Sequence, residues 1–427
     1  MKKLFVIIGL FIMSSMFLAN CGNSEGNKSA DNKFLIGVSI SGIDDKVYTD
    51  AIEKSINLAK KEINNKGGLL GRKIDFIIKY TQSNVENARL IAREFIDLDK
   101  VNAIIGGNTS SEFLAIGEEM VKPGGVPVIS HAATADSISD FEDNNLLWRT
   151  VPKDGFQAKV AAEYAISEKK MTSVILFVDN TYGQNLAEKF ESIYKNLGGS
   201  VLAKASFPYQ QGYTDYDFMQ HLQPLMAKKP QMLYLISYQQ DGIAVLTALE
   251  NNRNELNAEN LFILGCDGNR NESISDYDFA VFDNMAFVAP GKNRSPGSNY
   301  EKFISNYEKE YNLKNGEYYS QYIANVYDSV YLIAYAVLAA GKVDSASIAG
   351  SLQKISREGE IVNINEFSKG VELISKGTDI DYDGASGKIE FDANGDISSA
   401  LYEISKINRK EKAFEVVKSV EITESIE

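Results

Sequence analysis

The sequence predicts an α/β protein of two lobes, each built around a largely parallel β-sheet. Short, nearly continuous apolar runs alternate with segments of helical periodicity, which is typical of parallel strands covered by helices on both faces. This alternation pauses at residues 146–154 and again near residues 289–297, which divides it into two series. The length of 427 residues is also enough for two or three domains with sizeable cores.

The N-terminus predicts secretion and membrane attachment. Residues 1–20 combine a basic start with an apolar run, Leu4 to Met13, as a signal peptide does, and this run is too short for a spanning helix. Leu18-Ala19-Asn20-Cys21 resembles a bacterial lipobox, which implies that Cys21 is lipidated and begins the mature chain. An ordinary signal with an incidental cysteine is the alternative, because Asn20 replaces the usual small residue.

Residues 22–32 are small and polar, so residues 21–32 are expected to form a lipidated flexible tether. Removing residues 1–20 removes two lysines and no acid, which changes the net charge from −14 to −16. Such an acidic chain disfavours a nucleic-acid partner, which would need clustered Lys and Arg. Two cysteines cannot build a disulfide framework or a Cys-based zinc site, and two histidines leave little room for His-dependent catalysis.

The individual elements follow from apolar periodicity. Strands are expected at residues 34–40, 74–78, 103–106, 126–129, 173–178, 233–236 and 261–264. One helix is expected to begin after a Thr49 cap and to end at Gly67-Gly68, and further helices are expected at 88–98 and 184–197. Ligands of such folds bind in the crevice at the carboxyl ends of the strands.

Seven motifs in chain order carry a family resemblance. They are Asn64-Asn65-Lys66-Gly67-Gly68-Leu69-Leu70-Gly71-Arg72-Lys73, Ile105 to Ser111, Val128 to Ala135, Trp148 to Asp154, Asp179 to Gly183, Val326-Tyr327-Asp328, and Gly384 to Gly387. Together they resemble the leucine/isoleucine/valine-binding protein family (periplasmic binding protein type I), the substrate-binding subunits of amino-acid ABC importers. The resemblance covers about residues 33–415.

The resemblance implies two Rossmann-like lobes, joined by a three-strand hinge, that close on the ligand. It places residues 33–150 and 290–378 in lobe 1 and residues 151–289 and 379–427 in lobe 2. It implies a binding protein, not an enzyme, with no cofactor.

The resemblance also implies the ligand contacts. A free amino acid carries two charges, and leaving either one buried and unpaired would cost several kcal/mol. Ser110 and Thr134 match the positions that hold the ligand carboxylate, and the Ala132 carbonyl matches one that contacts the ammonium. Asp267 matches the acid that pairs with the ammonium. The alternatives are that Ser110 and Thr134 only cap helices and that Asp267 forms a turn.

Three tyrosines complete the predicted site. Tyr238 matches an aromatic residue near the ammonium, although a rim tyrosine is equally expected there. Tyr182 and Tyr48 are expected to line the side-chain pocket. His131 is expected in an exposed loop and Cys266 as a small packed residue.

One metal motif competes with this interpretation. Asp379, Asp381, Asp383 and Glu390 satisfy the calcium-loop expression D-x-[DN]-x-[DN]-G-x5-E. Ile389 and Phe391 alternate as in a strand, however, and the segment overlaps a family motif. We therefore expect no metal here.

The sequence thus predicts a secreted, lipid-anchored protein at the periplasmic or outer cell surface. It would bind an amino acid, branched-chain or related, and deliver it to an ABC permease in the cytoplasmic membrane. A two-lobed sensor for a signalling partner is one alternative. A binder of an amide, urea, an aromatic acid or a peptide is another.

Overall fold

A computed structural model describes residues 33–42, 46–210, 213, 215–313 and 321–423. The predicted signal peptide (1–20), Cys21 and the rest of the tether lie outside the described residues. The described chain forms two α/β lobes with largely parallel sheets, which confirms the predicted fold class.

The first lobe contains a parallel five-stranded sheet. Its strands are β1 (Lys33–Ile40), β2 (Lys73–Tyr80), β3 (Ala103–Gly106), β4 (Val128–Ser130) and β5 (Leu147–Arg149), in the order β2-β1-β3-β4-β5. A short parallel pair, β11 (Glu360–Asn363) and β12 (Ile380–Asp383), lies apart from this sheet.

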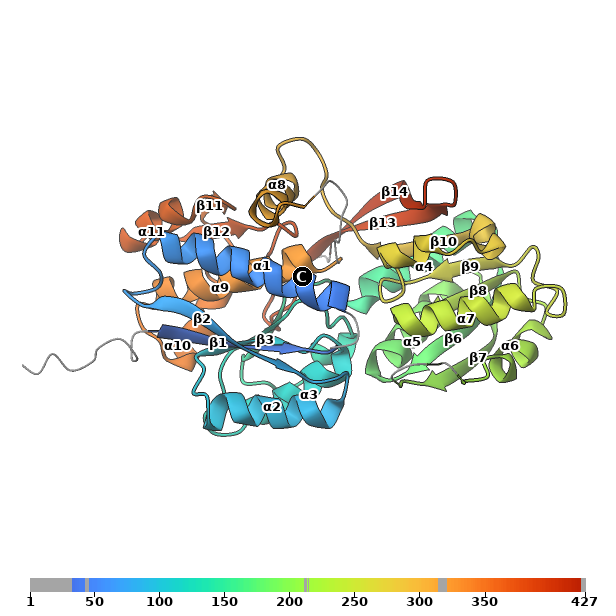
Figure 1. The fold of residues 1–427 in the computed structure, drawn as a ribbon, viewed down its shortest axis with the longest axis horizontal. Helices are drawn as coiled ribbons and strands as arrows, with labels where there is room; N and C mark the ends of the chain where they lie inside the picture. The colour runs from blue at the N-terminus through green and yellow to red at the C-terminus, as the bar shows by residue number, and fades with distance from the viewer. Residues whose placement is uncertain (1–32, 43–45, 211–212, 214, 314–320, 424–427) are drawn as a thin grey trace, which may run out of the picture. The chain divides into compact units, whose positions relative to one another are not determined.

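Helices cover both faces of the first sheet. The helices of lobe 1 are α1 (Lys46–Asn65), α2 (Val85–Asp97), α3 (Ser110–Met120), α8 (Asn299–Tyr311), α9 (Ile323–Ala340), α10 (Ser345–Leu352) and α11 (Phe367–Ser375), with a 3-10 turn η1 (Asp136–Ile138). Of these, α8 packs against α1, and α10 and α11 pack against α9. One core joins β1, α1 and α9, and another joins α2 and α3 to the opposite face. In Figure 1 the blue helix α1 and the orange helix α9 accordingly lie side by side, although they are far apart in sequence.

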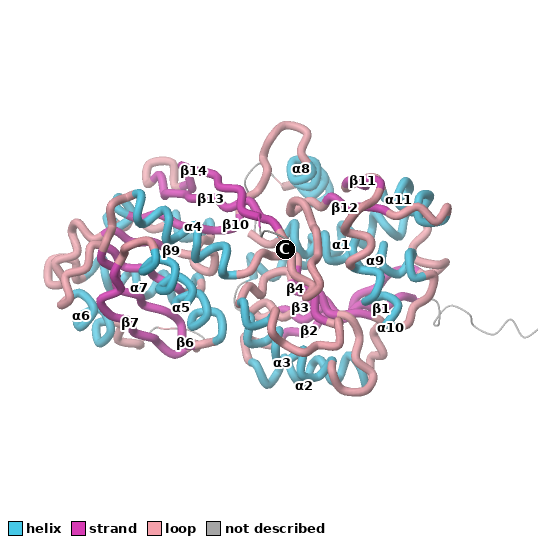
Figure 2. Tube along the Cα trace, turned by 180° about the vertical axis from the view of Figure 1, so that it is seen from behind, coloured by secondary structure: helices cyan, strands magenta, loops and turns pink. Residues whose placement is uncertain are grey.

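The second lobe contains a seven-stranded sheet. Its strands are β6 (Thr172–Asp179), β7 (Ser200–Pro208), β8 (Met232–Ile236), β9 (Phe262–Gly265), β10 (Met285–Pro290), β13 (Ser399–Asn408) and β14 (Ala413–Thr423). Its helices are α4 (Asp154–Ser167), α5 (Thr181–Asn196), α6 (Met219–Met226) and α7 (Gln239–Asn251), with 3-10 turns η2 (Glu272–Asp276) and η3 (Ala280–Asn284). The strand order is β14-β13-β10-β9-β8-β6-β7, in which β13 and β14 are antiparallel additions at one edge (Figure 2).

The chain passes between the lobes three times: between β5 and α4, between β10 and α8, and just before β13. The third passage falls later than the sequence predicts. Residues 379–398, which the resemblance assigns to lobe 2, instead pack with lobe 1, because β12 pairs with β11 and because Tyr382, Ile389 and Phe391 are buried in the core of α1 and α9. Lobe 2 resumes near Ser399.

Two helices of lobe 1, α1 and α9, need a separate description. Helix α1 begins at Lys46, so Thr49 lies inside the helix and donates a hydrogen bond to the Gly42 carbonyl instead of capping it. Within the described ranges, α9 has the length and apolar composition of a membrane-spanning helix. It is nevertheless buried along most of its length in the core of lobe 1, where the apolar surface serves packing.

Candidate functional site

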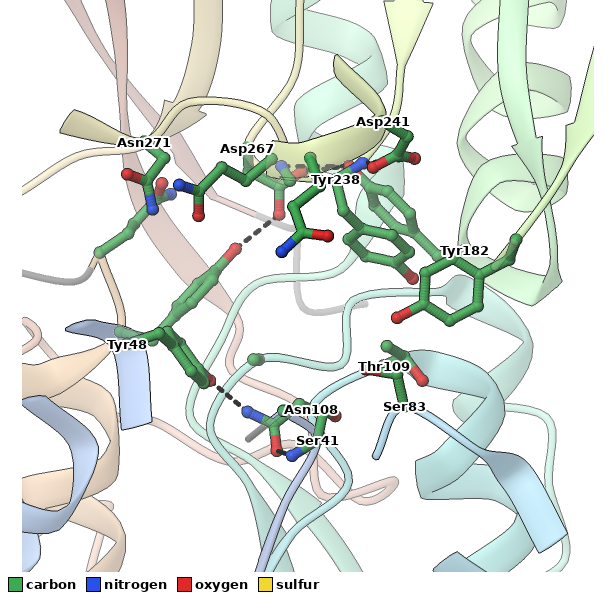
Figure 3. A pocket seen from close by; sticks show the side chains of 18 of the residues that line it. Ser41, Tyr48, Ser83, Asn108, Thr109, Tyr182, Tyr238, Asp241, Asp267 and Asn271 are labelled. Carbon is green, nitrogen blue, oxygen red and sulfur yellow. Dashed lines mark hydrogen bonds between the residues drawn. The ribbon is translucent and has the colours of Figure 1, made fainter. Parts of the chain in front are cut away.

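A cavity of about 220 Å³ lies between the lobes, and residues of both lobes form its wall (Figure 3). The structure places all seven predicted contacts on this wall: Tyr48, Ser110, Ala132, Thr134, Tyr182, Tyr238 and Asp267. Ala132, Thr134, Tyr238 and Asp267 follow strands, as expected for a crevice at the carboxyl ends of parallel strands, whereas Tyr48, Ser110 and Tyr182 lie in the first turns of helices.

Ser110 is positioned by the cap of the helix that it begins. Thr109 is the N-cap of α3, and its side chain forms a capping box with Glu112. The alternative prediction was that Ser110 only caps this helix, but Thr109 is the residue that caps it. The Ser110 hydroxyl instead accepts a hydrogen bond of 3.1 Å from the Ala135 amide, so its own hydrogen remains able to donate.

Thr134 and Ala132 lie in the segment between β4 and η1. Thr134 is only 2% exposed, and its carbonyl accepts a 2.8 Å hydrogen bond from the Asp154 amide at the start of α4. The Ser130 hydroxyl accepts from the Ala132 and Ala133 amides at 3.3 and 3.0 Å, which fixes the turn. This turn and the start of α3 form part of the lobe 1 wall of the cavity.

Asp267 follows β9 in lobe 2 and is only 5% exposed. Its two carboxylate oxygens accept hydrogen bonds from tyrosine hydroxyls of different lobes: Tyr182 of lobe 2 at 2.5 Å and Tyr322 of lobe 1 at 2.6 Å. No Lys or Arg forms an ion pair with it among the described residues. Asp267 is thus a buried carboxylate that faces a cavity and has only neutral partners.

The titratable neighbours of Asp267 favour their neutral forms. Burial and the negative charge of Asp267 raise the pKa of Tyr182 and of Tyr322 well above the usual range, so both remain donors. Nearby, burial raises the pKa of Asp154 well above its usual range, and the charges of Asp267 and Asp136 raise it further. This favours the protonated form of Asp154. An excess of buried negative charge at this point suits a cationic ligand group.

Tyr238 stands beside Asp267 as part of an aromatic group. Its ring stacks on Tyr182 with centroids 5.4 Å apart and lies 5.1 Å from the ring of Tyr209. The Asn180 side chain, which also caps α5, donates to the Tyr238 hydroxyl at 3.1 Å. These rings form an apolar but hydrogen-bonding wall on the lobe 2 side.

On the lobe 1 side, Tyr48 lies in a polar network with His131. The Tyr48 hydroxyl is 3.0 Å from His131 Nε2, and the Asn108 side-chain amide donates to Tyr48 and lies 3.3 Å from the same nitrogen. The expectation that His131 is exposed is wrong, because the residue is completely buried. Burial lowers the pKa of His131 to about 3, so its ring is neutral, and its Nε2 lies within hydrogen-bond distance of Tyr48 and Asn108.

Sequence reasoning missed several wall residues, notably Tyr322, Gln321, Tyr209 and Asn108. Asn108 stood inside a recognised motif and could have been found there. Tyr322 comes shortly before the motif Val326-Tyr327-Asp328, but nothing local marks a tyrosine that reaches Asp267 from 55 residues away. Tyr209 follows β7, a strand that apolar periodicity did not identify.

Other predicted candidates lie outside this cavity. Cys266 is a buried free cysteine whose pKa is raised to about 12 by burial, so it remains a thiol. Asp379 pairs with Lys354 at 3.0 Å and Glu390 pairs with Lys388, while Asp381 lies on β12. Over the described ranges, no group of three or more His, Cys, Asp or Glu side chains is arranged to hold a metal ion.

Comparisons with known proteins agree with this architecture. A family model described as "Periplasmic binding protein" matches residues 39–404. The Leu/Ile/Val-binding protein homolog 7 of Brucella abortus (strain 2308) is 25% identical over 286 residues, which cover 61% of this chain and 66% of that protein's length.

Two further proteins extend the comparison. The chemotactic signal transduction system substrate-binding protein BasB of Halobacterium salinarum (strain ATCC 29341 / DSM 671 / R1) is 24% identical over 356 residues, covering 80% of this chain and 78% of that protein. The branched-chain amino acid transporter substrate binding protein LivJ from Streptococcus pneumoniae str. Canada MDR_19A, solved with isoleucine, has a TM-score of 0.71 at 23% identity. That match covers 92% of this chain and 99% of the LivJ chain, and it establishes the fold.

Proposed function

Because this chain belongs to the periplasmic binding protein family, we propose that it binds a free α-amino acid between its lobes and delivers it to an ABC permease in the cytoplasmic membrane. Members of this family are extracytoplasmic substrate-binding proteins of transporters and not enzymes. The relative LivJ was solved with isoleucine, which supports an amino acid as the ligand class.

One observation carries the proposal: the two lobes place groups of opposite character on the wall of one cavity, hydrogen-bond donors on one side and a carboxylate on the other. The Ser110 hydroxyl and the segment around Thr134 form one wall, and the buried Asp267 carboxylate stands on the wall of the other lobe. Hydroxyl and amide donors suit the ligand carboxylate, and Asp267 with the Ala132 carbonyl suits the ammonium.

Binding then couples to closure. A ligand that contacts both lobes binds the closed arrangement more tightly than the open one, and only this difference in affinity can drive closure. Hydrogen bonds already cross between the lobes in this structure: the Ser111 hydroxyl donates to Thr181 Oγ1 at 3.0 Å and accepts from the Thr181 amide at 3.3 Å.

A thermal-shift screen of the full chain with the amino acids, followed by calorimetry of each hit, tests the ligand class. A specific ligand raises the unfolding temperature by mass action. If no amino acid raises it while an amide, urea, an aromatic acid or a peptide does, the ligand class is wrong.

We also propose that Cys21 carries a lipid that holds the protein at the membrane. The support is the lipobox-like sequence that precedes it. Metabolic labelling with an alkyne fatty acid should mark the wild-type chain and leave a Cys21→Ser chain unlabelled. Equal labelling of both chains would contradict the anchor.

A sensor role is the second candidate, because the chain matches BasB, a chemotactic substrate-binding protein, over 80% of its length. Deletion of the gene separates the two roles. Loss of uptake of the radiolabelled ligand supports import, whereas loss of a behavioural response with intact uptake supports a sensor.

A further inference from the structure

The wall of the cavity is unusual for a site that would hold an aliphatic side chain. Among the described residues that line it there is no Val, Leu, Ile, Met or Phe. Its large apolar surfaces are the rings of six tyrosines, and most of the remaining wall is hydroxyl, amide or charged. A branched aliphatic side chain gains its binding energy from burial against apolar surface, of which this wall offers little beyond the rings.

Gln321 adds a second and independent observation. It lines the cavity, and both its amide nitrogen and its amide oxygen are buried without a hydrogen-bond partner. Within the described part of the wall, it is the one side chain with buried polar atoms in this state. A buried polar group without a partner destabilises a protein, so a native site that keeps one needs an explanation.

Gln321 differs from two other amides of the wall, Asn108 and Gln239, which have partners. The Asn108 oxygen accepts from the Ser41 amide at 3.1 Å while its nitrogen donates to Tyr48. The Gln239 nitrogen donates to Ser273 at 2.6 Å. Gln321 immediately precedes Tyr322, the lobe 1 partner of Asp267, and all three residues line the same cavity.

From these observations we infer that the ligand is an amino acid whose side chain ends in a group that both donates and accepts hydrogen bonds, such as a carboxamide or a hydroxyl, and that Gln321 recognises this group. The inference rests on the proposed function, because it assumes an amino acid in this cavity. A carboxamide satisfies both atoms of Gln321 at once, whereas an isopropyl group of the same shape satisfies neither. A site built to hydrogen-bond a ligand group discriminates strongly against the analogue that lacks it.

Isosteric pairs of amino acids test this inference directly. Asparagine and leucine have the same branching, as do threonine and valine, so each pair differs in polarity more than in shape. Calorimetry with the full wild-type chain should show the polar member of at least one pair binding about tenfold or more tightly than its apolar partner. This comparison needs no variant.

The variant Gln321→Met keeps the length of the side chain and removes its hydrogen bonds. We expect it to weaken binding of the polar ligand about tenfold or more while leaving or improving binding of the apolar partner. Gln220→Met, at an exposed position on α6, is the matched control and should leave both affinities unchanged.

The outcomes separate the inference from the function on which it rests. Tight binding of leucine or valine, with a polar-to-apolar ratio that Gln321→Met does not change, would overturn the inference and leave amino-acid binding intact. Binding of no amino acid at all would refute the proposed function itself.

Discussion

Asp267 is the residue on which the proposed function depends most, and Asp267→Asn is its sharpest test. The substitution keeps the shape of the side chain and removes its charge. Because Asp267 is 5% exposed and has only tyrosine hydroxyls as partners, the ligand ammonium would be its sole cationic partner among the described groups. Truncating one partner of a buried charged pair costs about 2–5 kcal/mol, which corresponds to a Kd roughly 30-fold to several-thousand-fold weaker.

The stability of the unliganded variant provides the internal control. A tyrosine hydroxyl can rotate to accept from the new amide, so no hydrogen bond need be lost. Removing the charge also removes the cost of burying it in a site that is only 5% exposed. The unfolding temperature without ligand should therefore stay the same or rise, while the shift caused by ligand disappears.

Calorimetry and thermal unfolding of wild type, Asp267→Asn and Asp278→Asn measure both effects. The Asp278 carboxylate is 78% exposed and pairs with Arg409, so this control should bind as wild type does. An affinity of Asp267→Asn within about threefold of wild type would show that Asp267 does not bind the ammonium.

Three further predictions concern the surroundings of the cavity. His131, whose pKa is lowered to about 3, takes up a proton only in the unfolded chain between pH 6.5 and 3, so stability falls as pH falls through this window. Urea unfolding at pH 7 and pH 4 should show wild type losing about 3 kcal/mol more than His131→Gln; equal losses would contradict the burial of a neutral ring. Burial lowers the pKa of Lys292 to about 8, and its ammonium donates to Asn325 at 3.0 Å. Lys292→Met should therefore raise the free energy of unfolding at pH 7 by about 2 kcal/mol, and the gain should shrink as pH rises above 8, where the folded lysine is neutral; a gain independent of pH counts against this reasoning. Ser111→Ala removes two hydrogen bonds to Thr181 across the lobes and should weaken ligand binding about five- to thirtyfold, measured by calorimetry; an unchanged Kd would mean that these bonds do not favour closure.

The sequence predicted those residues of the candidate site whose position depends only on the strand or helix beside them. Ala132 and Thr134 lie in the loop directly after β4, and Ser110 begins the helix that follows β3; the alternation of strands and helices already places such segments at one edge of the sheet. The resemblance to the leucine/isoleucine/valine-binding proteins, which the family match confirms, identified these loops by their motifs. Asp267 was predicted in the same way, from its place just after a strand of lobe 2 and its match to a family position.

The remaining parts depend on tertiary contacts that no local pattern records. His131 is polar and stands in a loop, which predicts exposure, but Tyr48 and Asn108 give it partners in the interior. Tyr322 reaches Asp267 from the other lobe. Residues 379–398 were assigned to lobe 2 because nothing in their sequence reveals that β12 pairs with β11.

The three passages of the chain between the lobes have a consequence for the order of folding during synthesis. The strands of the first sheet are complete by Arg149, but α9, which covers one of its faces, begins only at Ile323. The strands β6 to β10 and the helices among them lie within residues 154–290, so they emerge from the ribosome as one continuous block. Contacts between neighbours in sequence form faster than contacts that close long loops. The middle of the chain should therefore fold while the first sheet is still half uncovered, and the nascent protein exposes an apolar sheet face until its last third arrives.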